Sequence, residues 1–286
     1  MVRASWTLTA IMMGLIACSD STGSNDVSLS VLLTDSPGDL IGAAVVEIGE
    51  ISLIPADGPA IVLTDLGGTH DLLALQNGVT ANLATLTIPA GPYVQLRMVV
   101  TAATVTLANG LTFNDGSTTQ SLTVPSGAQT GIKINLTSAD GDGASQGIVI
   151  SQGETVLVVD FDVSQNFRVQ GNPTTPAGLN SVSFTPAIRA VVQDVAGSIA
   201  GTVSSTSGAS LAGITLSAAQ TDAGVMEALQ TATASAVADS ATGMYTIRFL
   251  APGTYTVGIS VDGVADQPGI QVGVAENVTG VDFSIP

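Results

Sequence analysis

The sequence predicts an all-β protein built from two β-sandwich domains. Runs with period-two alternation or with many Val and Thr residues recur along the chain, as in Val27–Leu33, Gln95–Val105 and Ile132–Leu136. Turn signals rich in Gly, Pro, Asn and Asp separate these runs, for example Asn77-Gly78 and Pro125–Gly127. Many short strands joined by frequent turns are typical of sandwiches and barrels.

A short apolar segment precedes these strands and ends at Cys18, the only cysteine. Arg3 supplies a positive charge, Trp6–Ile16 is apolar, and Leu15–Cys18 resembles the lipobox of bacterial lipoproteins. A lone cysteine has no disulfide partner in the chain. We therefore expect a lipoprotein signal peptide over residues 1–17 and a lipid on Cys18.

Residues 18–26 are polar and contain glycine, which predicts a flexible tether. The lipobox resemblance implies a bacterial envelope protein that contacts the membrane through the lipid on Cys18. Because Ser19 rather than Asp follows the cysteine, the same resemblance favours the outer membrane or the cell surface.

The composition excludes several classes of function. The formal net charge is −17 with only six Lys and Arg residues, so nucleic acid is not an expected partner. The single histidine, His70, rules out a multi-histidine zinc site. His70 would be a general base beside Asp71 in one interpretation, but the expected turn at Gly67–Asp71 favours an exposed loop histidine.

The strand pattern restarts near Asp194–Gly197, which predicts a first domain over residues 27–193 and a second over residues 197–286. Both segments are long enough to bury a core. Residues 223–238 stay ambiguous, because Met226, Leu229 and Val237 define a helix face whereas the many Ala, Thr and Ser residues suit a pair of strands. The conformation of residues 221–235 is therefore left open.

The second domain has a repeated cadence of glycine turns and strands. It is carried by Gly197–Val203, Leu211–Leu216, Thr242–Ile247 and Leu250–Val257. The segment resembles a carboxypeptidase regulatory-like domain, which implies a transthyretin-like or immunoglobulin-like sandwich and, in some classifications, a carbohydrate-binding-like fold. After the Pro252-Gly253 turn, strand alternation directs Tyr255 into the core.

The first domain resembles a bacterial family known as domain of unknown function 4382. The matching stretches, in chain order, are Leu33–Pro37, Ile88–Arg97, Leu122–Gly127 with Thr130–Lys133, Val158–Asp162, and Thr185–Arg189. The family name implies no activity. Independently of any family, Tyr93 and Tyr255 both stand two residues after a turn glycine, which we interpret as convergence on one turn-and-plug arrangement.

Two acidic pairs are candidate ligands for calcium: Asp140 with Asp142, and Asp160 with Asp162. No acidic residue occupies the twelfth position after Asp140, so this is not an EF-hand loop. Asp160 and Asp162 are expected on one face of a strand. The alternative is that these carboxylates are solvated or pair with Arg97, Lys133 or Arg189.

These observations favour a non-catalytic envelope lipoprotein that presents a structural or protein-interaction surface, with an envelope protein or polysaccharide as its partner. The alternative is a carbohydrate-binding surface lipoprotein, with or without the assistance of calcium; the lack of tryptophan after Trp6 weighs against it. An enzyme would have to work with carboxylates alone, for example Asp160 or Asp162 with Asp142, and the few aromatic residues do not suit such a cleft. No cofactor is expected, and calcium is the one candidate.

Overall fold

The computed structural model describes residues 26–35, 40–64, 67–108, 110–124, 130–136, 147–151, 153–172, 178–186, 188–221 and 231–286. Cys18, Asp140 and Asp142 lie outside these ranges, and so does most of the expected tether. Within them, no helix is long and apolar enough to cross a membrane.

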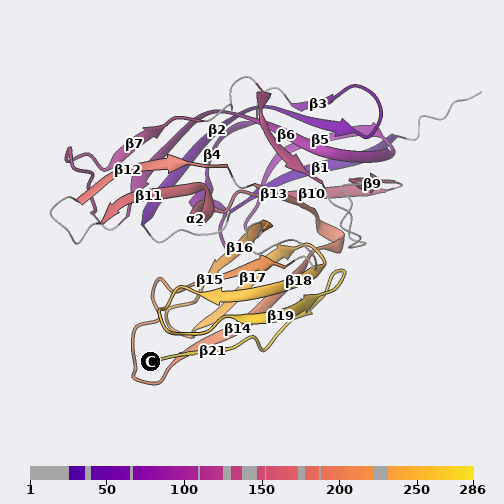
Figure 1. Cartoon of the computed structure of the whole chain (residues 1–286). Coiled ribbons are helices and arrows are strands. Elements are labelled where there is room, and N and C mark those ends of the chain that lie inside the picture. Colours follow the sequence, from indigo (N-terminus) through magenta and orange to yellow (C-terminus); the bar gives the residue numbers. More distant parts are fainter. Residues whose placement is uncertain are drawn as a thin grey trace, which may run out of the picture.

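The N-terminal domain is made of two sheets and a separate hairpin (Figure 1). Its elements are β1 (Asp26–Thr34), β2 (Ile41–Pro55), β3 (Ile61–Thr64), β4 (Gly68–Asp71), η1 (Leu72–Leu75), β5 (Ala81–Pro89), β6 (Gly91–Leu107), β7 (Thr119–Leu122), β8 (Ile132–Asn135), β9 (Ile148–Ile150), β10 (Glu154–Asp160), α2 (Val163–Asn166), β11 (Phe167–Asn172), β12 (Gly178–Phe184), β13 (Arg189–Val192) and η2 (Gln193–Val195). One sheet has the order β13-β10-β1-β5, and the other is built on β3-β2-β6-β7 with β4, β8 and β9 at its margins. The hairpin consists of β11 and β12.

Strand alternation produces the core between these sheets. In β1, Leu29, Val31 and Leu33 are fully buried, and in β6 Leu96 and Met98 are fully buried. Successive side chains of a strand point to opposite faces, so each strand gives one apolar face to a shared core. Most of the buried apolar residues described in the N-terminal domain belong to one cluster.

The C-terminal domain is a smaller sandwich with its own apolar cluster. Its strands are β14 (Gly197–Ser205), β15 (Thr215–Gln220), β16 (Thr231–Val237), β17 (Met244–Leu250), β18 (Gly253–Ile259), β19 (Gln267–Val272), β20 (Asn277–Val278) and β21 (Phe283–Ile285). One sheet has the order β17-β14-β20, with β21 also on β14, and the other has the order β16-β15-β18-β19. The predicted all-β fold with two sandwich domains is confirmed.

The turn-and-plug arrangement occurs once in each domain. Tyr93 and Tyr255 are each 2% exposed. The Tyr93 hydroxyl donates to the Pro89 carbonyl at 2.6 Å, and the Tyr255 hydroxyl donates to the Ala251 carbonyl at 2.7 Å. Each phenol therefore fills the core with its ring and closes the preceding turn through a carbonyl four residues earlier.

The structure changes one local expectation and decides part of one segment that the sequence left open. The segment expected as a turn at Gly67–Asp71 contains strand β4, in which His70 lies opposite Val46 of β2. Within the ambiguous segment 223–238, residues 231–237 form strand β16. Both outcomes have one cause, because pairing with a neighbouring strand decides the conformation of short segments whose local signals are weak.

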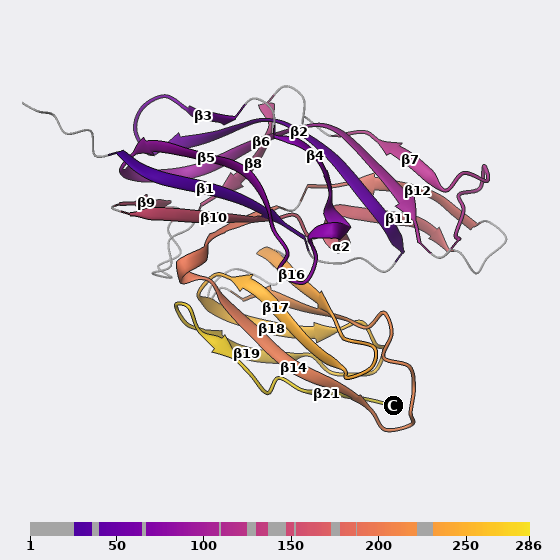
Figure 2. The same ribbon diagram turned by 180° about the vertical axis from the view of Figure 1, so that it is seen from behind.

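Two of the edge strands of the C-terminal domain, β16 and β17, lie on the side that faces the N-terminal domain, as both opposite views show (Figures 1 and 2). Each stands at the end of its sheet order. An edge strand presents unpaired backbone groups, which proteins commonly cover. The junction between the domains is therefore where the N-terminal domain can cover the backbone groups of these two edge strands.

Candidate functional site at the junction of the domains

The junction begins where β1 and β10 end. These strands are parallel neighbours, and Thr34 lies opposite Asp160 in their register. The carboxyl ends of parallel strands meet at the same edge of a sheet, so Asp35 and the segment Asp160–Asp162 come together there. The Phe161 amide donates to the Thr34 carbonyl at 3.1 Å and ties the two ends to each other.

Asp160 and Asp162 do not lie on a common strand, which corrects the expectation from the sequence. Strand β10 ends at Asp160, and Asp162 has a φ of 34°. Phe161 between them is fully buried and stacks on Phe184, with ring centroids 6.2 Å apart. The chain turns because the buried ring anchors it, and the Asp162 amide then donates to Asp160 Oδ1 at 3.2 Å.

Three carboxylates are buried here, at exposures of 4% for Asp35, 2% for Asp160 and 1% for Asp162. Asp35 Oδ1 accepts a hydrogen bond from the Val163 amide at 2.9 Å, at the start of the short helix α2. Hydrogen bonds from backbone amides thus offset part of the free-energy cost of burying these carboxylates.

Arg189 supplies the opposing charge. It lies opposite Asp160 in the antiparallel pair of β10 and β13, and its guanidinium forms an ion pair with the Asp160 carboxylate. Both side chains are largely excluded from water, at 13% and 3% exposure. Of the three cations expected near these carboxylates, Arg189 is the partner, whereas Arg97 and Lys133 face each other on β6 and β8 in the other sheet.

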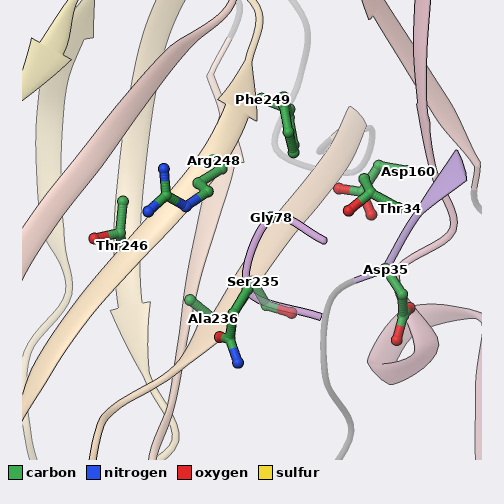
Figure 3. Close-up of a pocket in the computed structure, with 10 residues that line it drawn as sticks. Thr34, Asp35, Gly78, Asp160, Ser235, Ala236, Thr246, Arg248 and Phe249 are labelled. Atoms are coloured by element: carbon green, nitrogen blue, oxygen red, sulfur yellow. The ribbon is translucent and has the colours of Figure 1, made fainter. Parts of the chain in front are cut away.

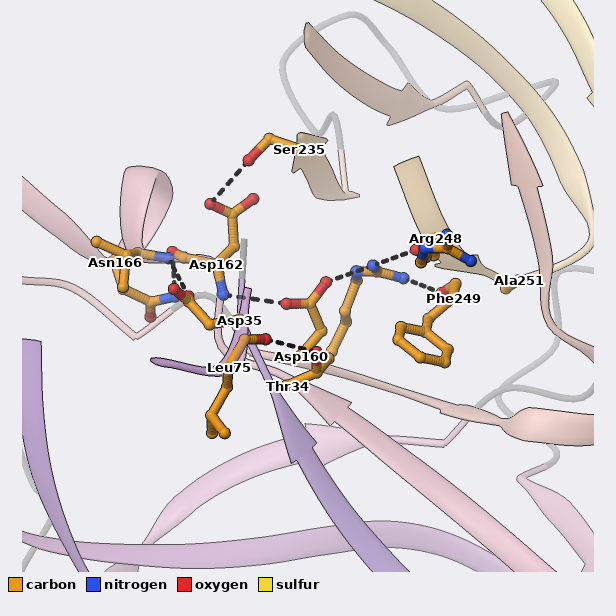
Figure 4. Close-up of polar contacts among 12 residues, drawn as sticks. Thr34, Asp35, Leu75, Asp160, Asp162, Asn166, Ser235, Arg248, Phe249 and Ala251 are labelled. Carbon is orange, nitrogen blue, oxygen red and sulfur yellow. Dashed lines mark hydrogen bonds and ion pairs between the residues drawn. The ribbon is translucent and has the colours of Figure 1, made fainter. Parts of the chain in front are cut away.

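The same guanidinium also binds the C-terminal domain. Figure 4 shows Asp160 of the N-terminal domain close to Arg248 and Phe249 of the C-terminal domain at this contact. The guanidinium donates to the carbonyls of Phe249 and Arg248, the latter at 3.2 Å. Phe249 has a φ of 54°, and the register of β17 on β14 shifts at this point. The irregularity turns two successive carbonyls of an edge strand toward one arginine, as bulges commonly do.

A second contact reaches the other edge strand. The Ser235 hydroxyl of β16 lies 3.5 Å from Asp162 Oδ1, a long hydrogen bond. Between the two contacts is a cavity of about 20 Å³ (Figure 3). That volume suffices for about one water molecule and for no larger ligand.

A wider groove of about 540 Å³ adjoins this cavity. The N-terminal domain lines it with Ile41, Leu73, Gln76 and Asn77, and the C-terminal domain lines it with residues of the β16–β17 connection and of β17, including Arg248. Asn77 and Gly78 both have positive φ and form a tight turn. A Cβ added to Gly78 would lie 2.8 Å from Arg248 Cδ, so glycine lets the arginine stem cross the turn.

Hydrogen bonding and burial shift the pKa of other titratable groups, among them Asp239, Tyr245 and Tyr93. Bonds from Thr242 and then Ala241 lower the pKa of the Asp239 carboxyl. Burial raises the pKa of the Tyr245 phenol, and the Asp282 carboxylate adds to that rise. Burial also raises the pKa of Tyr93. These groups support turns and the core, since Tyr245 donates to the Val281 carbonyl within the C-terminal domain.

His70 and Asp71 have separate roles. His70 Nε2 lies 2.7 Å from the Gly67 carbonyl, and Asp71 Oδ1 accepts the Leu73 amide at 3.2 Å, where it caps η1. Among the described residues no group of three or more His, Cys, Asp or Glu side chains is arranged to hold a metal. Because Asp140 and Asp142 are outside those residues, the four-aspartate calcium site stays a prediction.

The sequence did not single out Asp35, Ser235 or Arg248 as site residues. Asp35 was visible only as part of the Leu33–Pro37 stretch, and Arg248 only as one of six basic residues. Three of the stretches that carried the resemblance of the first domain end at the junction, namely those with Asp35, Asp160–Asp162 and Arg189. Their convergence was the available signal.

Comparison with solved structures gives weak likenesses. The Bacillus anthracis TIE protein is 11% identical, with a TM-score of 0.22, and the match covers 90% of this chain and 34% of that protein. The minor pilin GBS52 of Streptococcus agalactiae is 10% identical, with a TM-score of 0.22 and coverage of 92% and 97%. The shaft pilin SpaA of Lactobacillus rhamnosus GG is 12% identical, with a TM-score of 0.21 and coverage of 92% and 98%. These TM-scores are too low to indicate a shared fold.

Comparison with protein families is decisive. No curated protein matches the chain. The model of the carboxypeptidase regulatory-like domain matches residues 198–286, and the model of the domain of unknown function DUF4382 matches residues 26–175, more than half of the chain. The protein therefore belongs to the DUF4382 family and carries a carboxypeptidase regulatory-like domain at its C-terminal end.

Proposed function

We propose that the protein is a non-catalytic envelope lipoprotein whose two domains form one rigid body that presents a structural or protein-interaction surface. The observation that carries the proposal is the use of Arg189. Its guanidinium is bound by Asp160 of its own domain and by two carbonyls of the other domain. A buried arginine with such partners fixes the orientation of two elements.

The placement of the acidic residues supports a non-catalytic role. Asp160 forms an ion pair with Arg189, and the carboxylates of Asp35 and Asp162 accept hydrogen bonds within the junction. The adjoining cavity has room for about one water molecule. Carboxylates that act in glycoside hydrolysis need an open space between them for a sugar and a water molecule. The buried carboxylates therefore suit a structural contact between the domains better than a catalytic site.

The anchoring part of the proposal rests on the sequence around Cys18. A lipid at Cys18 and a flexible segment after it would attach the rigid pair of domains to a membrane, in the outer membrane or at the cell surface. The experiment expresses the wild-type protein and the Cys18→Ser variant in the native bacterium. We expect the wild-type protein in the outer-membrane fraction, with a diacylglyceryl-modified Cys18 in mass spectra of its N-terminal peptide.

The variant should lose that lipid and move to the soluble fraction. An Arg168→Gln variant is the matched control, because Arg168 is an exposed residue of β11 far from the anchor in sequence. Equal distribution of wild-type and Cys18→Ser protein in the soluble fraction would contradict the proposed function.

A further inference from the structure

The outer edge of β17 opens into the interdomain groove. In the described part of the chain β17 pairs with β14 alone. The carbonyl of Gly243, just before the strand, accepts a hydrogen bond from the Val203 amide of β14. The backbone N–H and C=O groups of the odd-numbered residues of β17 therefore point toward β14. Ala200, opposite Thr246, gives its carbonyl to Val281 instead. In an antiparallel ladder this alternation directs the backbone groups of Thr246 and of its even-numbered neighbours outward.

Two of these outward carbonyls are already capped. The Met244 carbonyl accepts the Asp239 amide at 2.9 Å, and the Arg248 carbonyl accepts the Arg189 guanidinium at 3.2 Å. Between them, no hydrogen bond among the described residues takes up the amide or the carbonyl of Thr246. Within the part of the chain that the structure describes, the edge is thus bonded at both ends and leaves one backbone donor and one acceptor, those of Thr246, for a partner strand.

The groove places a cationic side chain beside that pair. The Arg248 side chain is exposed and forms no ion pair with any described residue. Figure 3 shows its guanidinium turned toward Thr246 and away from Asp35 and Asp160. In a chain with a net charge of −17, an arginine in a concave site with no ion-pair partner among the described residues is a specific point of attraction for a carboxylate.

The remaining lining suits an uncharged extended chain. Gln76 and Asn77 offer amide groups, whereas Leu73 and the 61% exposed Met244 offer apolar surface. The groove volume of about 540 Å³ lies within the usual range of ligand sites. Asp239 lines the end of the groove near Met244. Met244 lies roughly 13 Å along β17 from Arg248, at about 3.3 Å per residue. A second carboxylate at that end would be repelled.

We propose that this groove binds an extended peptide segment of a partner protein, which adds as a short strand to β17 at Thr246 and places one Asp or Glu side chain on Arg248. Strand addition supplies affinity through backbone bonds, and the charged contact supplies specificity. The proposal deepens the proposed function, on which it rests, by naming the interaction surface and the class of partner.

The test selects peptides from a random dodecamer phage library on the lipid-free chain that begins at Ser19. We expect enriched peptides with one acidic residue among uncharged, strand-forming ones. Arg248→Gln should weaken a selected synthetic peptide at least tenfold, and Thr246→Pro should do the same because it removes the outward amide of an edge strand. Arg168→Gln, the same change on the exposed face of β11, should leave affinity unchanged.

Should Thr246→Pro fail to fold, N-methylation of alternate amides in the selected peptide tests strand pairing from the other side, with a tenfold loss expected for one of the two methylation phases. Failure to enrich any peptide would overturn the inference. So would equal affinity of the wild-type and Arg248→Gln proteins for the selected peptide, together with equal affinity of the wild-type protein for the methylated and unmethylated peptides. The proposed function has its own readout in the Cys18→Ser fractionation. An anchored protein that selects no peptide would contradict only the inference.

Discussion

The two domains use the same sandwich logic but differ in how their sheets end. Each has a buried tyrosine that closes a turn through a carbonyl four residues earlier. The N-terminal domain is built around β2 and β6, of 15 and 17 residues, whereas no strand of the C-terminal domain exceeds nine residues. The smaller domain leaves β16 and β17 as edges, and the larger one meets them with buried charges. Two domains with similar cores can therefore depend on each other where the edge strands of one meet the other.

The largest expected effect comes from breaking that dependence at Arg189. Arg189→Met leaves the Asp160 carboxylate buried without its cation, and removal of one partner of a buried pair costs about 3–5 kcal/mol. Urea unfolding measures the loss. Arg168→Met on the exposed strand face is the control and should change the unfolding free energy by less than about 0.5 kcal/mol.

The double variant Asp160→Asn with Arg189→Met sharpens the result. Replacement of both charges removes the uncompensated carboxylate, so the double variant should be more stable than Arg189→Met alone. A loss below about 1 kcal/mol for Arg189→Met would mean that the pair does not hold the junction.

Gly78→Ala should have the next largest effect, because it disturbs the contact between the domains as well as the turn. Gly78 has a φ of +86°, and its added Cβ would meet Arg248 Cδ at 2.8 Å. Gly208→Ala is a matched control, with a φ of +79° and no atom within 4 Å of the added Cβ. The backbone strain common to both is about 1 kcal/mol.

Thermal and urea unfolding of both alanine variants measure the difference. We expect Gly78→Ala to lose more stability than Gly208→Ala. Equal losses would show that the packing of Arg248 on the turn contributes nothing to the junction.

The tyrosine pair tests the similarity of the domains rather than their difference. Tyr93→Phe and Tyr255→Phe each remove one hydrogen bond and keep the ring. Each should lose about 1 kcal/mol in urea unfolding, since both hydroxyls donate to a carbonyl at nearly the same distance. A marked difference between the two would show that the shared geometry serves different needs.

The smallest effect is expected at Asp239, which is exposed and shapes the connection from β16 to β17. Hydrogen bonds from Thr242 hold its folded-state pKa below the ordinary value of 3.8. The stabilisation is therefore present above about pH 4 and is lost as the pH falls through the folded-state pKa. Asp239→Asn should flatten the dependence of the thermal midpoint on pH below about pH 4. An unchanged limb would contradict the role of this turn.

The sequence predicted most of what depends on local pattern. Strand alternation gave β1, β6 and β8, and glycine turns followed by tyrosine gave the two core plugs. The region 223–238 resisted prediction because Ala, Thr and Ser suit both helix and strand when packing is unknown. The turn after Asp160 was not predicted, because no local sequence signal indicates the positive φ of Asp162.

The junction was predictable only in part. Arg189 was one of three cations expected near Asp160 and Asp162, since any of them could have been brought near by the fold. The contacts to Ser235, Arg248 and Phe249 join residues that are 59 or more positions apart, and such pairings follow from tertiary structure alone. The groove beside them could not be inferred from either domain considered separately.

Differential scanning calorimetry of the chain that begins at Ser19 tests the central claim, that the two domains form one body held by Arg189. We expect a single transition with equal calorimetric and van't Hoff enthalpies for the wild-type protein, and two separate transitions for Arg189→Met. Two transitions in the wild-type protein, at temperatures that Arg189→Met leaves unchanged, would contradict the account.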